Sequence, residues 1–202
     1  MGGDEDFYGH IGTEGEKCYW MIDLQNRKTR LSTVNVALIG IFSAVWVALN
    51  FTIAPLGFSL TGLPTIHSII IFITLLLVTW ATSQYGAASL VGIIGSAIVV
   101  LAGGPLPVLG FVPAALIFDL ILLANRHRIN MKPINITISV LASIVCAYVA
   151  AVANGILILN LQLTFTLTVW AGWNVLGGII GAAVTLPIIA VLEKANAKKV
   201  KF

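Results

Sequence analysis

The stretch that decides the fold is the uncharged run over residues 133–192, PINITISVLASIVCAYVAAVANGILILNLQLTFTLTVWAGWNVLGGIIGAAVTLPIIAVL. It is far longer than the roughly 20 apolar residues that cross a bilayer once. Backbone groups in lipid must bond to one another, so such a run forms helices or a closed barrel. Barrel strands alternate apolar and polar residues, whereas this run is continuously apolar. It therefore predicts membrane-spanning helices.

The same composition extends over most of the chain. Hydrophobic residues make up 58% of its 202 residues and charged residues 9%, whereas about a quarter of a soluble domain is charged. Between Leu31 and Asn125 the only formal charge is Asp119. We therefore expect an all-α integral membrane protein in three parts. These are a polar, disordered tail (1–30), a six-helix membrane domain (31–193) and a basic tail (194–202).

Breaks in the apolar sequence divide the membrane domain into six spans. A region with two prolines and two glycines, residues 53–64, is expected to form a long loop after the first span. Shorter breaks are expected at residues 103–107 and 160–162. The spans cover approximately residues 32–51, 65–102 (two spans, dividing at 83–86), 108–124, 134–159 and 166–192.

The basic residues predict the orientation of this bundle. They form three clusters, before span one, after span four and after span six, with an even number of spans between successive clusters. Basic loops stay in the cytoplasm, so both termini are expected there and the uncharged loops outside the cell. We expect the protein to lie in the cell membrane. The net charge of +3 gives no reason to expect nucleic acid binding. The clusters are Arg27, Lys28, Arg30; Arg126, Arg128, Lys132; and Lys194, Lys198, Lys199, Lys201.

Motifs of catalysis are missing from the sequence. No P-loop occurs and every lysine lies outside the spans, so the chain does not hydrolyse ATP by that route. No nucleophile elbow or zinc-protease motif occurs either, and the two cysteines have no metal-like spacing. We expect no enzyme activity, no cofactor and no metal site. An enzyme acting on lipid would need a catalytic cluster that the sequence does not contain.

Polar and aromatic residues near the outer ends of the spans are the candidate substrate-binding residues. Aromatic walls with a few amides and an imidazole suit a small, ring-containing solute. Other interpretations stay open, because tryptophans also anchor helices at the membrane surface and asparagines bond neighbouring helices. His67 also suits an interfacial position or a partner for the helix start. The candidates are Asn50, His67, Asn154, Trp170, Trp173 and Asn174.

Asp119 is expected to face the protein interior, since a charge at a helix centre costs about 2.5–3.5 kcal/mol on insertion scales. Its position in the cytoplasmic half of span four favours a structural or coupling role. Small residues recur every four positions in several spans, including Gly40, Ala44 and Ala48 in span one. Such stripes pack helices within one chain or against another subunit.

The sequence resembles the substrate-binding (S) component of an energy-coupling factor (ECF) vitamin transporter. Residues 28–30 followed by VALIGIFSAVWVA (36–48) are similar to the opening of that family. Ala44 and Ala48 match its Ala-x-x-x-Ala motif, which docks a transmembrane coupling subunit. GFVPAALIFDL (110–120) is similar to its fourth helix.

The resemblance implies a six-helix protein that captures a vitamin or precursor outside and passes it to the coupling subunit, while two ATPase subunits hydrolyse ATP. It implies a pocket formed by residues 55–63, residues 103–106 and the outer ends of spans five and six. The alternatives are a stand-alone facilitator or ion-coupled carrier using Asp119, and an assembly subunit that binds no solute.

Overall fold

The structure, a computed structural model, describes residues 32–124, 129 and 132–195. The expected disordered tail at 1–30, most of the basic tail at 194–202 and most basic residues of the three clusters lie outside them. The chain divides into two units, residues 1–34 and Asn35–Phe202. Of the first unit only residues 32–34 are described, so the account below concerns the second.

Every regular element in the described residues is helical. The elements are α2 (Thr33–Thr61), α3 (Thr65–Thr82), α4 (Ala87–Leu101), η1 (Leu106–Gly110), α5 (Phe111–Leu123), α6 (Pro133–Val152), η2 (Ala153–Ile158), α7 (Leu163–Phe165), η3 (Thr166–Trp170) and α8 (Ala171–Lys194). The connections predicted at 83–86 and 160–162 are confirmed.

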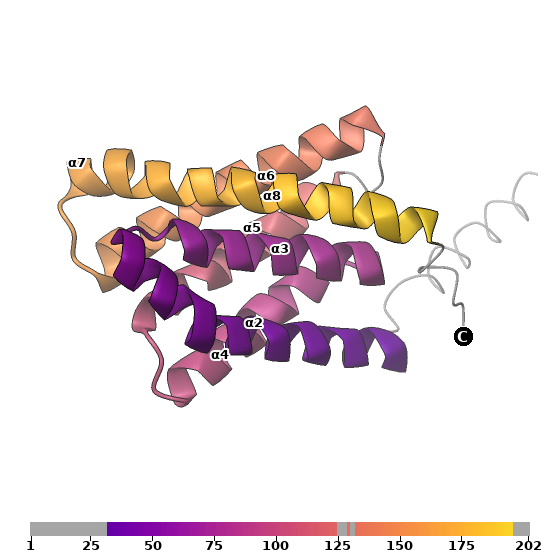
Figure 1. Ribbon diagram of the computed structural model, residues 1–202, viewed down its shortest axis with the longest axis horizontal. Helices are drawn as coiled ribbons and strands as arrows, with labels where there is room; N and C mark the ends of the chain where they lie inside the picture. The colour runs from indigo at the N-terminus through magenta and orange to yellow at the C-terminus, as the bar shows by residue number, and fades with distance from the viewer. Residues whose placement is uncertain (1–31, 125–128, 130–131, 196–202) are drawn as a thin grey trace, which may run out of the picture. The chain divides into compact units, whose positions relative to one another are not determined.

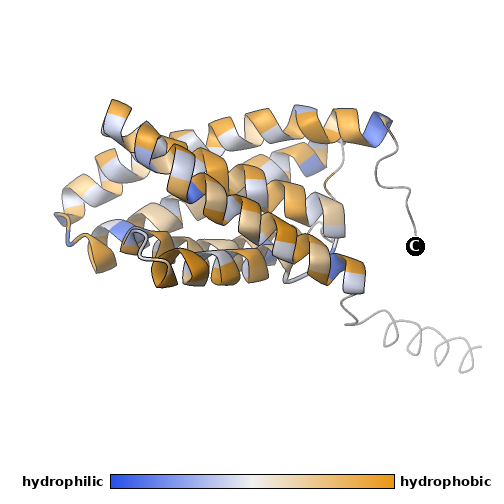
Figure 2. Ribbon diagram, turned by 60° about the horizontal axis from the view of Figure 1, so that its bottom comes forward, coloured by the Kyte–Doolittle hydropathy of each residue, from blue (hydrophilic) through white to orange (hydrophobic). Residues whose placement is uncertain are grey.

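Five helical segments are long and apolar enough to cross a membrane: Thr33–Thr61, Thr65–Thr82, Leu106–Leu123, Pro133–Ile158 and Leu163–Lys194. They indicate a multi-pass membrane protein. The predicted third span is the shorter helix α4, which has 15 residues, fewer than the roughly 20 of a typical crossing. Figure 2 shows apolar residues along the whole length of the helices.

The loop predicted at residues 53–64 is largely wrong, because α2 continues through Pro55 to Thr61 and has 29 residues. A proline removes one backbone donor, but membrane helices tolerate this loss because neighbouring groups satisfy the freed carbonyl. The helix ends only at Gly62, whose φ is 66°. That left-handed conformation is open to glycine without steric cost.

The bundle has two distinct ends (Figure 1). The connections after α2, after α4 and between η2 and α7 lie at one end, here called the hairpin end. The α3–α4 turn, the start of α6 and the end of α8 lie at the other, here called the charged end. The amide of Asn35 near the start of α2 donates a hydrogen bond to Gln84 in the α3–α4 turn, 2.5 Å away.

Small residues hold the central helices together. The most extensive contacts join α3 to α8, α6 to α8, α4 to α5 and α5 to α6. Gly177 and Gly181 of α8 lie against the backbone of α3, and Gly178 lies against Ala147 of α6. Gly92 of α4 lies against Ala115 of α5. These small-residue positions therefore serve close packing within the chain.

Candidate solute-binding site

Two π-helical segments, η2 and η3, flank the connection at residues 159–162 at the hairpin end. The Leu159 N–H donates to the Asn154 carbonyl 2.9 Å away, the i to i−5 bond of a π-helix. The segments contact each other, with Gly155 packed against Thr166. Such widened turns are rare and frequently occur at functional sites. Periodicity in the sequence gives no signal for them.

Asn154 begins this site from η2. Its side chain is 4% exposed, and its amide lies directly against the backbone of Gly110 in η1. Its Oδ1 has no hydrogen-bond partner within the described part of the chain. A buried amide oxygen left without a donor costs free energy, so it requires an explanation.

His67 adds an imidazole from the first turn of α3. Its ring centroid lies 4.8 Å from that of Phe111, with the ring planes at 41°. Its Nε2 is buried and, within the described residues, unpaired. Because Phe111 follows Gly110 directly, His67 and Asn154 contact consecutive residues at the start of α5.

Trp170 and Asn174 complete the site from η3 and α8. The Ser68 hydroxyl donates to Asn174 Oδ1 at 2.7 Å, and Asn174 Nδ2 donates to the Trp170 carbonyl at 2.8 Å. Asn174 thereby bonds α8 to α3. The indole Nε1 of Trp170 is buried, and no partner for it lies among the described residues.

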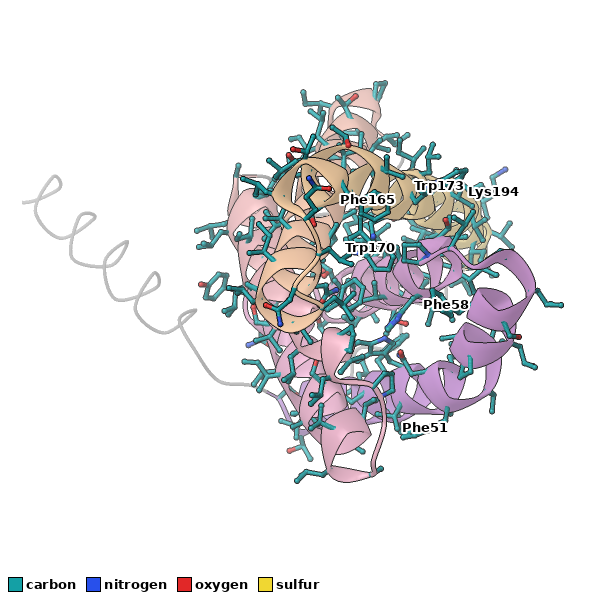
Figure 3. All side chains as sticks on the ribbon, turned by 90° about the vertical axis from the view of Figure 1, so that its left-hand side faces the viewer. Phe51, Phe58, Phe165, Trp170, Trp173 and Lys194 are labelled. Atoms are coloured by element: carbon teal, nitrogen blue, oxygen red, sulfur yellow. The ribbon has the colours of Figure 1, made fainter. Side chains whose placement is uncertain are left out.

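These contacts link four of the six predicted binding residues through their neighbours in the chain. They are here called the polar cluster: His67, Asn154, Trp170 and Asn174. The contacts leave out the other two. Trp173 is 37% exposed, because its side chain lies about 100° around the helix from that of the buried Asn174. Figure 3 views the bundle from the hairpin end and labels both tryptophans.

Asn50 is buried on α2, separate from the contacts that join the polar cluster. Its Nδ2 donates to the Trp46 carbonyl at 3.0 Å, and its Oδ1 is unpaired within the described residues. The Trp46 side chain packs on Gly95 of α4. Asn50 therefore belongs to the face that α2 turns toward the bundle.

Charge is confined to the charged end in the part of the chain that the structure describes. The charged residues there are Asp119, Lys132, Glu193 and Lys194. The polar cluster lies at the start of α3, in η2, at the end of η3 and at the start of α8, which is the hairpin end. The polar cluster therefore contains uncharged amide and indole groups and one imidazole, but no carboxylate, ammonium or guanidinium.

Asp119 is fully buried in α5 and bonds to the start of α4. Its Oδ2 accepts hydrogen bonds from the backbone N–H of Ser89, at 2.7 Å, and from the Ser89 hydroxyl. Since α4 begins at Ala87, that N–H is one of the helix-terminal donors that lack an intrahelical partner. A carboxylate is also favourable at a helix N-terminus. These contacts favour a structural role for Asp119.

The small-residue stripe of α2 differs from the stripes of the other helices. Gly40, Ala44 and Ala48 are all exposed, and a Cβ added to Gly40 would meet nothing within 4 Å. Of the 18 consecutive residues that form the apolar part of α2, 22% are buried, compared with 39–56% of the corresponding residues in the other long helices. The inward face is a different set: Ile39, Ser43, Trp46, Asn50, Ala54 and Gly57.

No protein-family model, curated protein or solved structure matches the chain. The resemblance to ECF substrate-binding components therefore stays a prediction from the sequence.

Proposed function

We propose that this chain is the substrate-binding subunit of an ATP-driven, ECF-type importer in the cell membrane. It captures a vitamin or vitamin precursor at its outer face and delivers it through a transmembrane coupling subunit. Two ATPase subunits hydrolyse the ATP. In this arrangement the chain crosses the membrane six times with both termini in the cytoplasm, and the hairpin end faces outward.

The contrast between the stripe of α2 and the other stripes carries this proposal. The small residues of α4 and α8 are used within the bundle, whereas Gly40, Ala44 and Ala48 face outward. A flat strip of small residues lets a second helix approach closely, which is how membrane helices associate. The strip lies on the peripheral helix, where a partner reaches it without displacing another helix.

The position of the polar cluster supports solute capture. Its unpaired imidazole, amide and indole groups lie at the end opposite Lys132 and Lys194. By the positive-inside rule the lysines belong in the cytoplasm, so we expect the cluster to face the outside.

A bulky substitution on the α2 stripe tests the proposal. Ala44→Trp, co-expressed with a coupling subunit and two ATPase subunits, is expected to abolish co-purification of the complex while the chain alone stays folded. The matched control is Ala97→Trp, since Ala97 is also exposed but lies on α4. If Ala44→Trp assembled as well as the control, α2 would not be the docking helix.

An ion-coupled carrier built around Asp119 is the alternative. The hydrogen bonds from Ser89 already engage Oδ2 of that carboxylate. The two functions differ in their energy source. A carrier moves solute in vesicles that contain this chain alone and an ion gradient, whereas the importer requires ATP and its partners.

A further inference from the structure

We infer that the polar cluster recognises an uncharged ring compound that carries at least one hydrogen-bond donor and one acceptor. The inference rests on the proposed function, because it assumes that the chain binds a solute, and it narrows the class of that solute.

The hydrogen-bonding requirement follows from the unpaired atoms. Asn154 Oδ1 only accepts, so the solute must offer it an N–H or O–H. Trp170 Nε1 only donates, so the solute must offer it an oxygen or ring nitrogen. His67 Nε2 does either, according to its tautomer. A solute with both kinds of group satisfies atoms that no described residue satisfies.

The hydrogen bond to Asn154 Oδ1 is expected to place the strictest geometric requirement on the solute. Asn154 is 4% exposed, and Gly110 packs against its amide, which fixes the amide in place. Two other polar side chains at this end of the bundle make hydrogen bonds elsewhere. Asn174 bonds to Ser68 and Trp170, and the Thr166 hydroxyl donates to the Gln162 carbonyl at 3.0 Å.

The inference that the solute is uncharged follows from the position of the charged residues. The four charged side chains that the structure describes all lie toward the charged end, away from the cluster. A buried charge is costly unless an opposite charge pairs with it. A carboxylate, phosphate or quaternary ammonium compound would find no such partner among the cluster residues. The site therefore discriminates against charged relatives of its solute.

The inference that the solute contains a ring follows from the aromatic side chains. His67 and Phe111 are in contact. Trp170 lies at the end of η3, where its carbonyl accepts from Asn174, which is bonded to Ser68 next to His67. Aromatic faces favour flat rings through stacked or tilted contacts and add area beyond what hydrogen bonds supply. A flat ring with polar edge atoms fits both sets of groups.

Matched pairs of neutral and charged compounds test the inference on the purified full chain in lipid nanodiscs. The probes are riboflavin with its 5′-phosphate, nicotinamide with nicotinate, biotinamide with biotin, and pyridoxine with its phosphate. At least one neutral member is expected to bind, and its charged partner to bind roughly tenfold more weakly or worse. Equal or tighter binding of the charged partner overturns the inference, and so does failure of every neutral member to bind.

Two variants locate the binding. Trp170→Phe keeps the ring but removes the indole donor, and is expected to weaken binding roughly tenfold. Trp173→Phe is the control, since Trp173 is exposed on the same segment, and is expected to leave affinity unchanged. Asn154→Leu is expected to abolish binding without lowering the unfolding temperature of the ligand-free chain, because it removes a buried unpaired oxygen. Unchanged affinity in Trp170→Phe, or equal losses in both tryptophan variants, overturns the inference.

The two proposals fail in different ways. If the charged probes bind best while the chain still assembles with its partners through α2, only the solute class is wrong. If assembly itself is absent, the importer function fails whatever the probes show.

Discussion

The packing of α8 on α3 provides the sharpest prediction about stability, through the substitution Gly177→Ala. A Cβ at this position would lie 2.5 Å from the Thr65 carbonyl oxygen and 2.7 Å from Ser68 Cβ. Real Cβ atoms essentially never come within 3.0 Å of a non-bonded heavy atom, and the nearest atom here belongs to the backbone, so the two helices must move apart. Overpacking of this kind costs about 1–3 kcal/mol.

Gly172→Ala is the matched control, because Gly172 lies in the same helix and a Cβ there meets nothing within 4 Å. Both variants gain the same helix propensity of alanine over glycine, about 0.8–1 kcal/mol. The difference between them therefore isolates the steric cost. We expect Gly177→Ala to be less stable than Gly172→Ala by about 1–3 kcal/mol.

Unfolding by sodium dodecyl sulfate in mixed micelles measures this difference. The signal is reaction of a thiol probe with Cys146, which is fully buried in α6, in a chain whose Cys18 is replaced by Ser. The separation should also lengthen the bond between Ser68 and Asn174 and weaken solute binding. Equal stability of the two alanine variants would refute the close approach of α3 and α8.

Three further predictions concern Asp119, the site backbone and the orientation. Asp119→Ala removes the bonds to Ser89 and is expected to lower stability by about 1–3 kcal/mol without changing solute affinity. If Asp119→Ala instead lost solute transport while its stability was unchanged, the ion-coupled carrier would be favoured. Gly110→Ala displaces the Asn154 amide and is expected to lower the affinity of the neutral probe, as titration calorimetry would show; unchanged affinity would exclude Asn154 from the site. Cysteines introduced at residue 161 and at residue 84 should react with an impermeant reagent from outside and from inside the cell respectively, and the reverse pattern would invert the topology.

Hydropathy and turn residues were sufficient to predict most helix boundaries, and the exception has a physical cause. The prolines and glycines of residues 53–64 predicted a loop, as they would in water. In an apolar segment the backbone has no solvent to bond, so α2 continues past Pro55 until Gly62. Lipid-exposed segments therefore tolerate helix breakers that a soluble domain does not.

The candidate site could be predicted only in part. His67, Asn154 and Asn174 lie at one end because the helices alternate in direction, which the sequence shows. Whether Trp173 or Asn174 faces inward depends on a rotation of about 100° between successive helix residues, and composition does not fix that phase. The π-helical turns depend on hydrogen-bond register and leave no periodic signal.

Long-range partners were equally invisible in the sequence. Asp119 was expected to face the interior, but its bond to Ser89 joins residues that are 30 positions apart. Likewise the stripes of α2 and α8 have the same small-residue spacing. Only their burial distinguishes the one that packs within the chain from the one that faces outward.

Uptake into proteoliposomes tests the central claim most directly. The radiolabelled compound is the neutral probe that binds the purified chain, and the vesicles contain either the chain alone or the chain with its coupling and ATPase subunits. The importer account predicts binding by the chain alone, and accumulation only with the partners and with ATP on their cytoplasmic side. Accumulation by the chain alone under an ion gradient, without ATP, would contradict it.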